Sequence, residues 1–362
     1  MEATLRPSPV LATVDYDRPG VQHGFLRLPY SRDDSAWGSV VIPITVIRGG
    51  EGPTALLTGA NHGDEYEGPL ALFDLAQTLR PDEVVGRVII VPAMNYPAFL
   101  AGTRTSPIDR GNLNRSFPGR PDGSVTEKIA DYFQRVLLPL ADVVLDFHSG
   151  GKTLDFLPFC AAHILPGEGP EVRAQEERAF ALVRAFAAPF SVRMLEIDAI
   201  GMYDTAAEEM GKVFVTTELG GGGTATARTV RIAREGLRRV LAAAGVTRGP
   251  GGPAPAPLPP TRWLDMPDAD CFVFAEDGGL VEFLADLGDS VAAGDPVARL
   301  WPLGRTGVAP SELRAARAGV LCARHVPGIV KPGDCVAVVA VEVADASQLE
   351  GPGPRELEGV VP

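Results

Sequence analysis

The chain has 362 residues, of which 45% are hydrophobic, and a formal net charge of -13 at pH 7. This charge argues against a nucleic-acid-binding surface, which needs Lys and Arg clustered on one face, and the four scattered cysteines argue against a disulfide framework or zinc knot. No window approaches the roughly 20 apolar residues of a membrane span, and the N-terminus lacks the features of a secretory signal, so we expect a cytoplasmic protein without nucleic-acid or membrane partners.

The first predicted elements are two antiparallel edge strands, 23–31 and 37–46, because the residues between them are too few for a crossover helix. Short runs rich in β-branched residues then alternate with segments of helical character. The runs are "SVVIPITVIRG", "TALLTGAN", "RVIIVPAMN", "ADVVLDFHSGG" and "KVFVTTELGGG", and the helical segments are "GPLALFDLAQTLR", "VTEKIADYFQRVLL" and "EERAFALVRAFAAPF". Buried strands that alternate with helices predict an α/β fold with a mixed, mostly parallel sheet flanked by helices.

A run of proline, glycine and alanine at residues 249–260 divides the chain, because proline continues neither a helix nor a central strand. We therefore predict a domain over 1–248, a linker over 249–260 and a second domain over 261–362. The second domain has short strands, Gly-Asp turns and little helix, which predicts a small all-β, barrel-like unit. Its turns "VAAGD" and "VKPGD" are similar to those of biotinyl and lipoyl carriers. No lysine occupies the hairpin tip where those carriers hold their cofactor, so we interpret the unit as structural or as a homo-oligomer interface.

Potential metal ligands follow the predicted strands at the edge where α/β sheets bind their ligands. His62 and Glu65 follow one run at H-x-x-E spacing, and His148 ends another. Each has an ordinary explanation alone, as a hydrogen-bonded loop histidine, a glutamate that favours a helix start, or a satisfied core histidine. One metal ion explains all three together. Two imidazoles and one carboxylate are the ligand set of a catalytic zinc, which keeps a position for water.

Glu218 and one long loop add candidate catalytic and binding groups. Glu218 ends a further run and could bond backbone amides or pair with an arginine. It could equally be the unligated carboxylate that moves protons in a zinc hydrolase. The arginines of the loop could pair with neighbouring aspartates, or they could bind a substrate carboxylate and stabilise an oxyanion. The loop, residues 102–119, contains Arg104, Arg110, Asn114 and Arg115.

Four motifs in order, "HGDE", "NLNR", "DFHSGG" and "TTELGG", resemble the succinylglutamate desuccinylase and aspartoacylase family, relatives of the zinc carboxypeptidases. The resemblance covers about residues 40–245. It implies a zinc-carboxypeptidase-like α/β fold with one zinc ion per chain. The ligands that it implies are His62, Glu65 and His148.

The same resemblance implies roles for the remaining candidates. Glu218 would be the general base and acid, and Asn114 with Arg115 would hold the substrate carboxylate. An arginine upstream of the Asn-Arg pair polarises the scissile carbonyl in this family. Arg104 is similar to that arginine, but its spacing to Arg115 is longer than in aspartoacylase, so Arg110 is a rival.

Longer stretches, such as "GMYDTAAEEMGKVFVTTELGGGGT", resemble a deacetylase branch of the family. This implies hydrolysis of a small zwitterionic amide that is acetylated on its alpha nitrogen and carries a side-chain ammonium. Tyr203 is a candidate to close on this substrate, although a loop tyrosine more often packs. The candidate partners of the ammonium are Asp64, Asp198, Asp204, Glu208 and Glu209.

Three alternatives stay open. The chain could be a deacylase of another N-acyl amino acid, of the acetylaspartate or succinylglutamate type, or a zinc carboxypeptidase for small peptides. Outside the enzymes, it could be a binding or scaffold protein whose metal site is vestigial. A vestigial site would leave every property unchanged in a Glu218→Gln variant.

Overall fold

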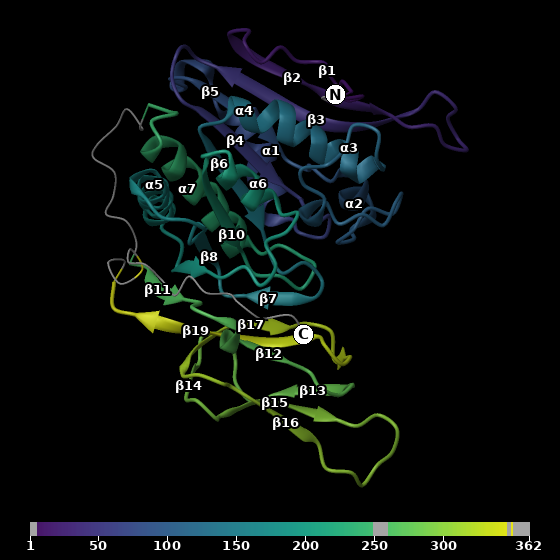
Figure 1. Cartoon of the computed structure of the whole chain (residues 1–362), viewed down its shortest axis with the longest axis vertical. Coiled ribbons are helices and arrows are strands. Elements are labelled where there is room, and N and C mark those ends of the chain that lie inside the picture. Colours follow the sequence, from purple (N-terminus) through teal and green to yellow (C-terminus); the bar gives the residue numbers. More distant parts are fainter. Residues whose placement is uncertain (1–5, 249–259, 346–348, 350–362) are drawn as a thin grey trace.

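The structure, a computed structural model, describes residues 6–248, 260–345 and 349. Figure 1 shows a part with helices and strands that lies against a smaller part built from strands. The predicted linker lies outside the described residues except for Pro260. The division of the chain into domains at that linker stays a prediction.

The bounds of the elements are as follows. The strands of the α/β part are β1 (Leu11–Ala12), β2 (Gly20–Pro29), β3 (Ser39–Arg48), β4 (Thr54–Gly59), β5 (Arg87–Val91), β6 (Val143–His148), β7 (Leu154–Phe156), β8 (Phe159–His163), β9 (Phe190–Met194) and β10 (Val213–Glu218). Its helices are α1 (Glu67–Thr78), η1 (Pro81–Glu83), α2 (Tyr96–Ala101), η2 (Leu113–Arg115), α3 (Val125–Tyr132), η3 (Phe133–Leu137), α4 (Leu138–Leu140), α5 (Pro170–Phe186), α6 (Tyr203–Glu209) and α7 (Ala227–Ala243). The C-terminal elements are β11 (Arg262–Asp265), η4 (Ala269–Cys271), β12 (Phe272–Phe274), β13 (Gly279–Phe283), β14 (Ser290–Val291), β15 (Pro296–Trp301), β16 (Ser311–Arg314), β17 (Gly319–His325), β18 (Ile329–Val330) and β19 (Cys335–Val343).

A mixed sheet runs through the α/β part in the order β1-β2-β3-β5-β4-β6-β10-β8-β9 and continues into β11, β19, β17 and β14. The pairing is parallel from β5 through β4 and β6 to β10, and again from β8 through β9 to β11. β2 and β3 form the predicted antiparallel edge. β10 and β8 also form an antiparallel pair, and antiparallel pairs join the C-terminal strands. The sheet is therefore mixed, with parallel pairing in two blocks.

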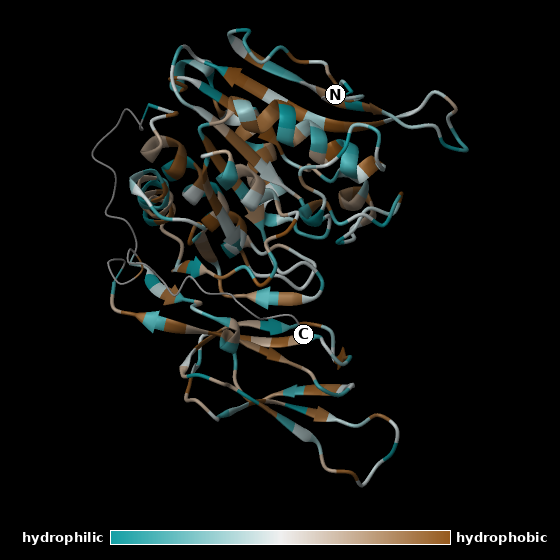
Figure 2. Cartoon of the chain, in the orientation of Figure 1, coloured by the Kyte–Doolittle hydropathy of each residue, from teal (hydrophilic) through white to brown (hydrophobic). Residues whose placement is uncertain are grey.

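The central strands are buried on both faces. Successive residues of a strand point to opposite faces, and Leu57 accordingly packs with α1, α5 and α7, whereas Leu56 packs with α3 and α6. Figure 2 shows hydrophobic residues along these strands. Because helices or edge strands cover both faces, the central strands are continuous apolar runs, and they hold the residues at their carboxyl ends in fixed positions.

The described C-terminal residues form strands and one short helical turn, η4, which confirms the predicted all-β character of this region. β13, β15, β16 and β18 form a second antiparallel sheet, which packs against β17 and β19. β7 pairs with β17, so the C-terminal strands also contact the carboxyl edge of the α/β sheet. The barrel-like likeness stays a prediction. Within the described ranges, none of the helices has both the length and the apolar character that would let it cross a bilayer.

Candidate active site

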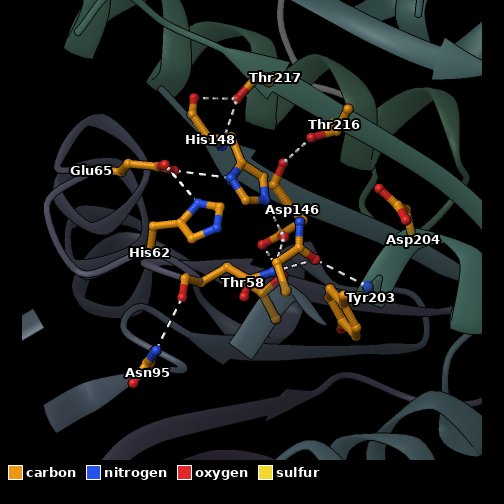
Figure 3. Close-up of polar contacts among 12 residues, drawn as sticks. Thr58, His62, Glu65, Asn95, Asp146, His148, Tyr203, Asp204, Thr216 and Thr217 are labelled. Carbon is orange, nitrogen blue, oxygen red and sulfur yellow. Dashed lines mark hydrogen bonds and ion pairs between the residues drawn. The ribbon is translucent and has the colours of Figure 1, made fainter. Parts of the chain in front are cut away.

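His62, Glu65 and His148 lie together at the carboxyl ends of β4 and β6. The Nδ1 atom of His62 is 2.8 Å from Glu65 Oε1, and the Nδ1 atom of His148 is 2.9 Å from Glu65 Oε2. Figure 3 shows both imidazoles turned toward the Glu65 carboxylate. One potential ligand atom from each residue lies within 4.8 Å of the others. The cluster could therefore hold a metal ion.

The turn after β4 brings His62 and Glu65 into this position. Ala60 has a φ of 48°, in the left-handed region, where the chain leaves the strand. A Cβ on Gly63 would lie 2.0 Å from the backbone carbon of Ala98, and a Cβ on Gly68 would lie 2.1 Å from the Cβ of Phe147. Both glycines are thus required by close packing against α2 and β6.

Asp146 supports His148 from the same strand, since residues two apart on a strand point to one face. The Nε2 atom of His148 lies 2.9 Å from Asp146 Oδ2. The carboxylate also accepts hydrogen bonds from Thr58 Oγ1 at 2.6 Å and Asn61 Nδ2 at 3.2 Å. A carboxylate on the far nitrogen of a ligating histidine fixes the ring and its tautomer. Sequence reasoning missed Asp146 and Asn61, although the D-x-H spacing in "DFH" could have indicated the first.

The charge states of His62 and Glu65 are those of metal ligands, whereas His148 has to lose a proton before it binds a metal ion. Burial lowers the pKa of His62 to about 4, so its imidazole is neutral, as a metal ligand must be. Burial alone would raise the pKa of Glu65, but the imidazoles of His62 and His148 hold it below its usual value. Burial would also lower the pKa of His148, but the carboxylates of Glu65 and Asp146 raise it well above the usual value. Two imidazole nitrogens and an ionised carboxylate suit a first-row divalent cation such as zinc.

Glu218 lies beside His148, because β10 pairs with β6 in a register that places the two residues opposite each other. It lines the same cavity as His62 and Glu65. Its Oε2 atom is buried and has no hydrogen-bond partner among the described residues. Burial, followed by the nearby carboxylate of Glu65, raises the pKa of Glu218 well above its usual value. A carboxyl group with a raised pKa next to a metal site can exchange protons at neutral pH.

The loop over 102–119 supplies three groups to this cavity, which has a volume of about 400 Å³. Arg104 Nη1 lies 3.8 Å from Glu65 Oε1. Asn114 is buried, and its Oδ1 accepts hydrogen bonds from Asn61 Nδ2 at 3.1 Å and from the backbone N of Tyr203 at 3.0 Å. Arg115 is exposed at the cavity, and its Nη1 donates to the Asn114 carbonyl at 2.7 Å. The cavity therefore has two guanidinium groups on its wall.

Two of the predicted site residues lie elsewhere. Arg110 is exposed, with a φ of 58°, and it does not line the cavity, so Arg104 is the better placed of the two rivals. The ring of Tyr203 is fully buried and packs against Phe117, Phe133 and Phe214. The expectation that Tyr203 closes on a substrate therefore has to be corrected, because its ring belongs to the core beneath α6.

The opposite wall of the cavity combines acidic and C-terminal residues. Glu196, Asp198 and Asp204 line it, and Glu196 also faces a neighbouring cavity of about 1090 Å³. Glu196 was missed by sequence reasoning, because nothing in its local pattern distinguishes it from a surface glutamate. The C-terminal residues on this wall are Met266, Phe272, Phe274, Cys322, Cys335 and Val338.

Comparison with known proteins gives consistent matches. Residues 51–244 match the family model described as the succinylglutamate desuccinylase/aspartoacylase catalytic domain. The chain is 56% identical over 335 residues to N-alpha-acetyl-L-2,4-diaminobutyric acid deacetylase of Halomonas elongata, which covers 92% of this chain and 96% of that protein.

Solved structures give the same result. The product-bound ectoine utilization protein EutE (DoeB) of Ruegeria pomeroyi is 64% identical, with a TM-score of 0.88, and covers 93% of this chain and 100% of that one. A succinylglutamate desuccinylase/aspartoacylase of Rhodobacter sphaeroides is 39% identical, with a TM-score of 0.86, over 93% of this chain and 100% of that one.

The mixed sheet and the His-Glu-His cluster at its carboxyl edge define an α/β protein with a site suited to a metal ion. The family match covers more than half of the chain, and the deacetylase of Halomonas elongata and the EutE structure align over nearly all of it. The chain belongs to the succinylglutamate desuccinylase/aspartoacylase family, as its four motifs predicted.

Proposed function

We propose that the chain is a zinc-dependent amide hydrolase that converts N-alpha-acetyl-L-2,4-diaminobutyrate into acetate and L-2,4-diaminobutyrate in ectoine catabolism. The observation that carries this proposal is the convergence of His62, Glu65 and His148 next to Glu218 in one cavity. The substrate is taken from the deacetylase of Halomonas elongata, at 56% identity, and the ectoine context also from the EutE structure.

In this proposal, His62, Glu65 and His148 hold one zinc ion. Zinc at such a site acts as a Lewis acid and lowers the pKa of a coordinated water toward about 7. The neutral imidazole of His62 and the ionised carboxylate of Glu65 are the forms required for this binding. Asp146 orients His148 through its Nε2 atom.

Glu218 moves the protons of the reaction. The oxygen of water forms a bond to the acetyl carbon, and the bond between that carbon and the alpha nitrogen breaks. Glu218 accepts the proton that the water loses and donates it to the leaving amine. Its buried Oε2, which has no hydrogen-bond partner in the described part of the chain, and its raised pKa suit both transfers.

Arg104 and Arg115 bind the negative groups of the substrate and of the reaction. Arg104 lies on the Glu65 side of the cavity, where its guanidinium can stabilise the oxygen of the amide as negative charge grows on it. Arg115, placed by the buried Asn114, binds the substrate carboxylate. The motif order and the strand-end position of the ligands also support a zinc-carboxypeptidase-like arrangement of the α/β part.

A substrate panel tests the proposal. With zinc-loaded and chelated protein, we measure acetate release from acetyl-diaminobutyrate and acetylaspartate, succinate release from succinylglutamate, and release of the C-terminal amino acid from a dipeptide. We expect zinc-dependent release from acetyl-diaminobutyrate, with a kcat/KM at least tenfold above the others. A higher kcat/KM for acetylaspartate or succinylglutamate would show that the chain is one of the alternative deacylases. A higher kcat/KM for the dipeptide would show that it is a carboxypeptidase.

A further inference from the structure

Four ionisable side chains gather beside the active-site cavity, outside the proposed zinc ligands. His163 is buried, with its Nδ1 2.9 Å from Glu208 Oε1 and its Nε2 3.1 Å from Glu196 Oε1. Asp204 completes the group, since one ligand atom each of His163, Glu196 and Asp204 lie within 4.8 Å of one another. Even with His163 protonated, three carboxylates face one positive charge.

Among the described residues, only one oxygen of the Asp204 carboxylate accepts hydrogen bonds. Its side chain is 6% exposed, and its Oδ1 accepts hydrogen bonds from the backbone N and the Oγ1 of Thr205, at 2.6 and 3.3 Å. No donor reaches Oδ2 among the residues that the structure describes, and in Figure 3 no contact joins Asp204 to the other drawn residues. The residue lines the same cavity as the proposed zinc ligands. Oδ2 is therefore available at the cavity to accept a hydrogen bond from a bound ligand.

The neighbouring guanidinium groups of Arg193 and Arg178 do not donate to Asp204 Oδ2. The guanidinium of Arg193, at the edge of the group, forms two short bonds to Asp265, at 2.6 and 2.5 Å. Arg178 is exposed and lines the larger cavity, not the one that Asp204 lines. Burial, and then the carboxylates of Glu196 and Glu208, raise the pKa of Asp204 to about 7, although His163 opposes the shift. Burial and the neighbouring carboxylates thus outweigh His163, and a further cation beside Asp204 would favour its ionised form.

The position of Asp204 matches the shape of the proposed substrate. The backbone N of Tyr203, the residue before Asp204, donates to Asn114 Oδ1, and Gly201 packs against the backbone of Arg115. The start of α6 is therefore fixed against the residues proposed to bind the substrate carboxylate. Arg115, Asp204 and Glu196 line one cavity, so a small amino acid has room to place its carboxylate at Arg115 and its side chain toward the two acids.

Resting on the proposed function, we propose that Asp204, with Glu196, binds the side-chain ammonium of the substrate and so selects a diamino acid. A primary ammonium has three donors, which suits the free Oδ2 of Asp204 and the Glu196 carboxylate together. The other acidic candidates are less suited. Asp198 and Glu209 are exposed, and Glu208 and Asp64 do not line the cavity, where Asp64 instead accepts a hydrogen bond from the backbone N of Lys152.

The test compares two acetylated amino acids that differ only in the cation. N-alpha-acetyl-L-2,4-diaminobutyrate has an ammonium where N-acetyl-L-norvaline has a methyl group. In Asp204→Asn we expect kcat/KM to fall at least tenfold for the diaminobutyrate and to stay within about threefold for the norvaline. Glu209→Gln, an exposed acid on the same helix, is the matched control and should change neither value. An equal loss on both substrates, or no loss on either, would overturn the proposal.

A binding measurement separates this proposal from the proposed function. Calorimetry with L-2,4-diaminobutyrate and L-norvaline on wild type and Asp204→Asn reports the subsite without turnover, and Glu196→Gln replaces the Asp204 variant if that variant does not fold. If Asp204→Asn loses affinity for diaminobutyrate only, and wild type shows no hydrolysis, the ammonium subsite is supported and the proposed function is contradicted. Hydrolysis by wild type that is indifferent to Asp204 would remove only the subsite. A second metal equivalent per chain that disappears in the variant would show a metal site here and would also overturn the proposal.

Discussion

Glu218 ends β10 beside His148 and keeps one buried carboxylate oxygen free of hydrogen bonds within the described part of the chain. Glutamine has nearly the same shape but cannot accept and return a proton. We therefore expect Glu218→Gln to lower kcat at least about a hundredfold. Zinc content, measured by mass spectrometry, should stay at one per chain, because Glu218 is not among the proposed ligands. Unchanged turnover in this variant, with exposed Glu177→Gln as the control, would point to a vestigial site.

Asp146 holds His148 through Nε2 and is itself fully buried. Asn in its place loses the negative charge that orients the imidazole. The zinc affinity of Asp146→Asn should fall about 10- to 100-fold, as measured by competition with a chelator. An exposed acid that does not line the active-site cavity, changed in Asp277→Asn, should leave the affinity unaltered. Equal affinities in wild type and Asp146→Asn would show that this contact does not support the metal site.

The pKa of Asp204, raised by burial to about 7 from 3.8, predicts a pH-dependent stability. Between these values the folded state keeps a proton that the unfolded chain has lost. The contribution of Asp204 to the free energy of unfolding therefore falls as pH rises from about 4 to 7. In urea unfolding without ligand, Asp204→Asn should gain stability relative to wild type on going from about pH 4.5 to pH 8. A difference that is constant with pH would be inconsistent with the raised pKa.

Residues at strand ends could be predicted from the sequence, whereas their supporting partners could not. His62, Glu65, His148 and Glu218 follow apolar runs, and the structure brings all four to one cavity. Asn61 contacts Asp146 across 85 positions of chain, which no local pattern indicates. The burial of Tyr203 likewise depends on distant aromatic neighbours, which is why its predicted substrate contact was wrong.

At the scale of elements, the turn between β4 and α1 depends on close packing at Gly63. Alanine there would place its Cβ 2.0 Å from the backbone of Ala98. Gly63→Ala should lower the free energy of unfolding by about 1–3 kcal/mol and weaken zinc binding, because the shift moves His62. Gly304→Ala, where no atom lies within 4 Å, is the control. Unfolding in urea and chelator competition measure the two effects, and wild-type values in Gly63→Ala would show that the turn has room to adjust.

The strands and helices were predicted unevenly, for physical reasons. The β-branched runs became β3, β4, β5, β6 and β10. β8, with the sequence "FCAAH", was not predicted, because alanine has low strand propensity and only tertiary burial makes this segment a strand. The predicted helical segment 176–190 extends beyond the end of α5 at Phe186. The helix ends there because the next residue, Ala187, has a left-handed φ of 53°.

At the scale of the whole molecule, the C-terminal strands complete the active-site cavity. β7 pairs with β17, which joins Asp155 to Arg324, and Phe272 and Phe274 line the same cavity as His62, Glu65 and His148. The sequence predicted an all-β region, but pairing between segments so distant along the chain is not encoded in any local pattern. Its role as a wall of the site therefore became clear only from the structure.

We propose that one zinc ion, held by His62, Glu65 and His148, makes this chain a deacetylase. The most direct measurement is acetate release from N-alpha-acetyl-L-2,4-diaminobutyrate by metal-stripped protein as zinc is added back in fractions of an equivalent. We expect no release without metal and a linear rise in release that ends at one zinc ion per chain. Full release from metal-free protein, or a rise that ends at two zinc ions per chain, would contradict it.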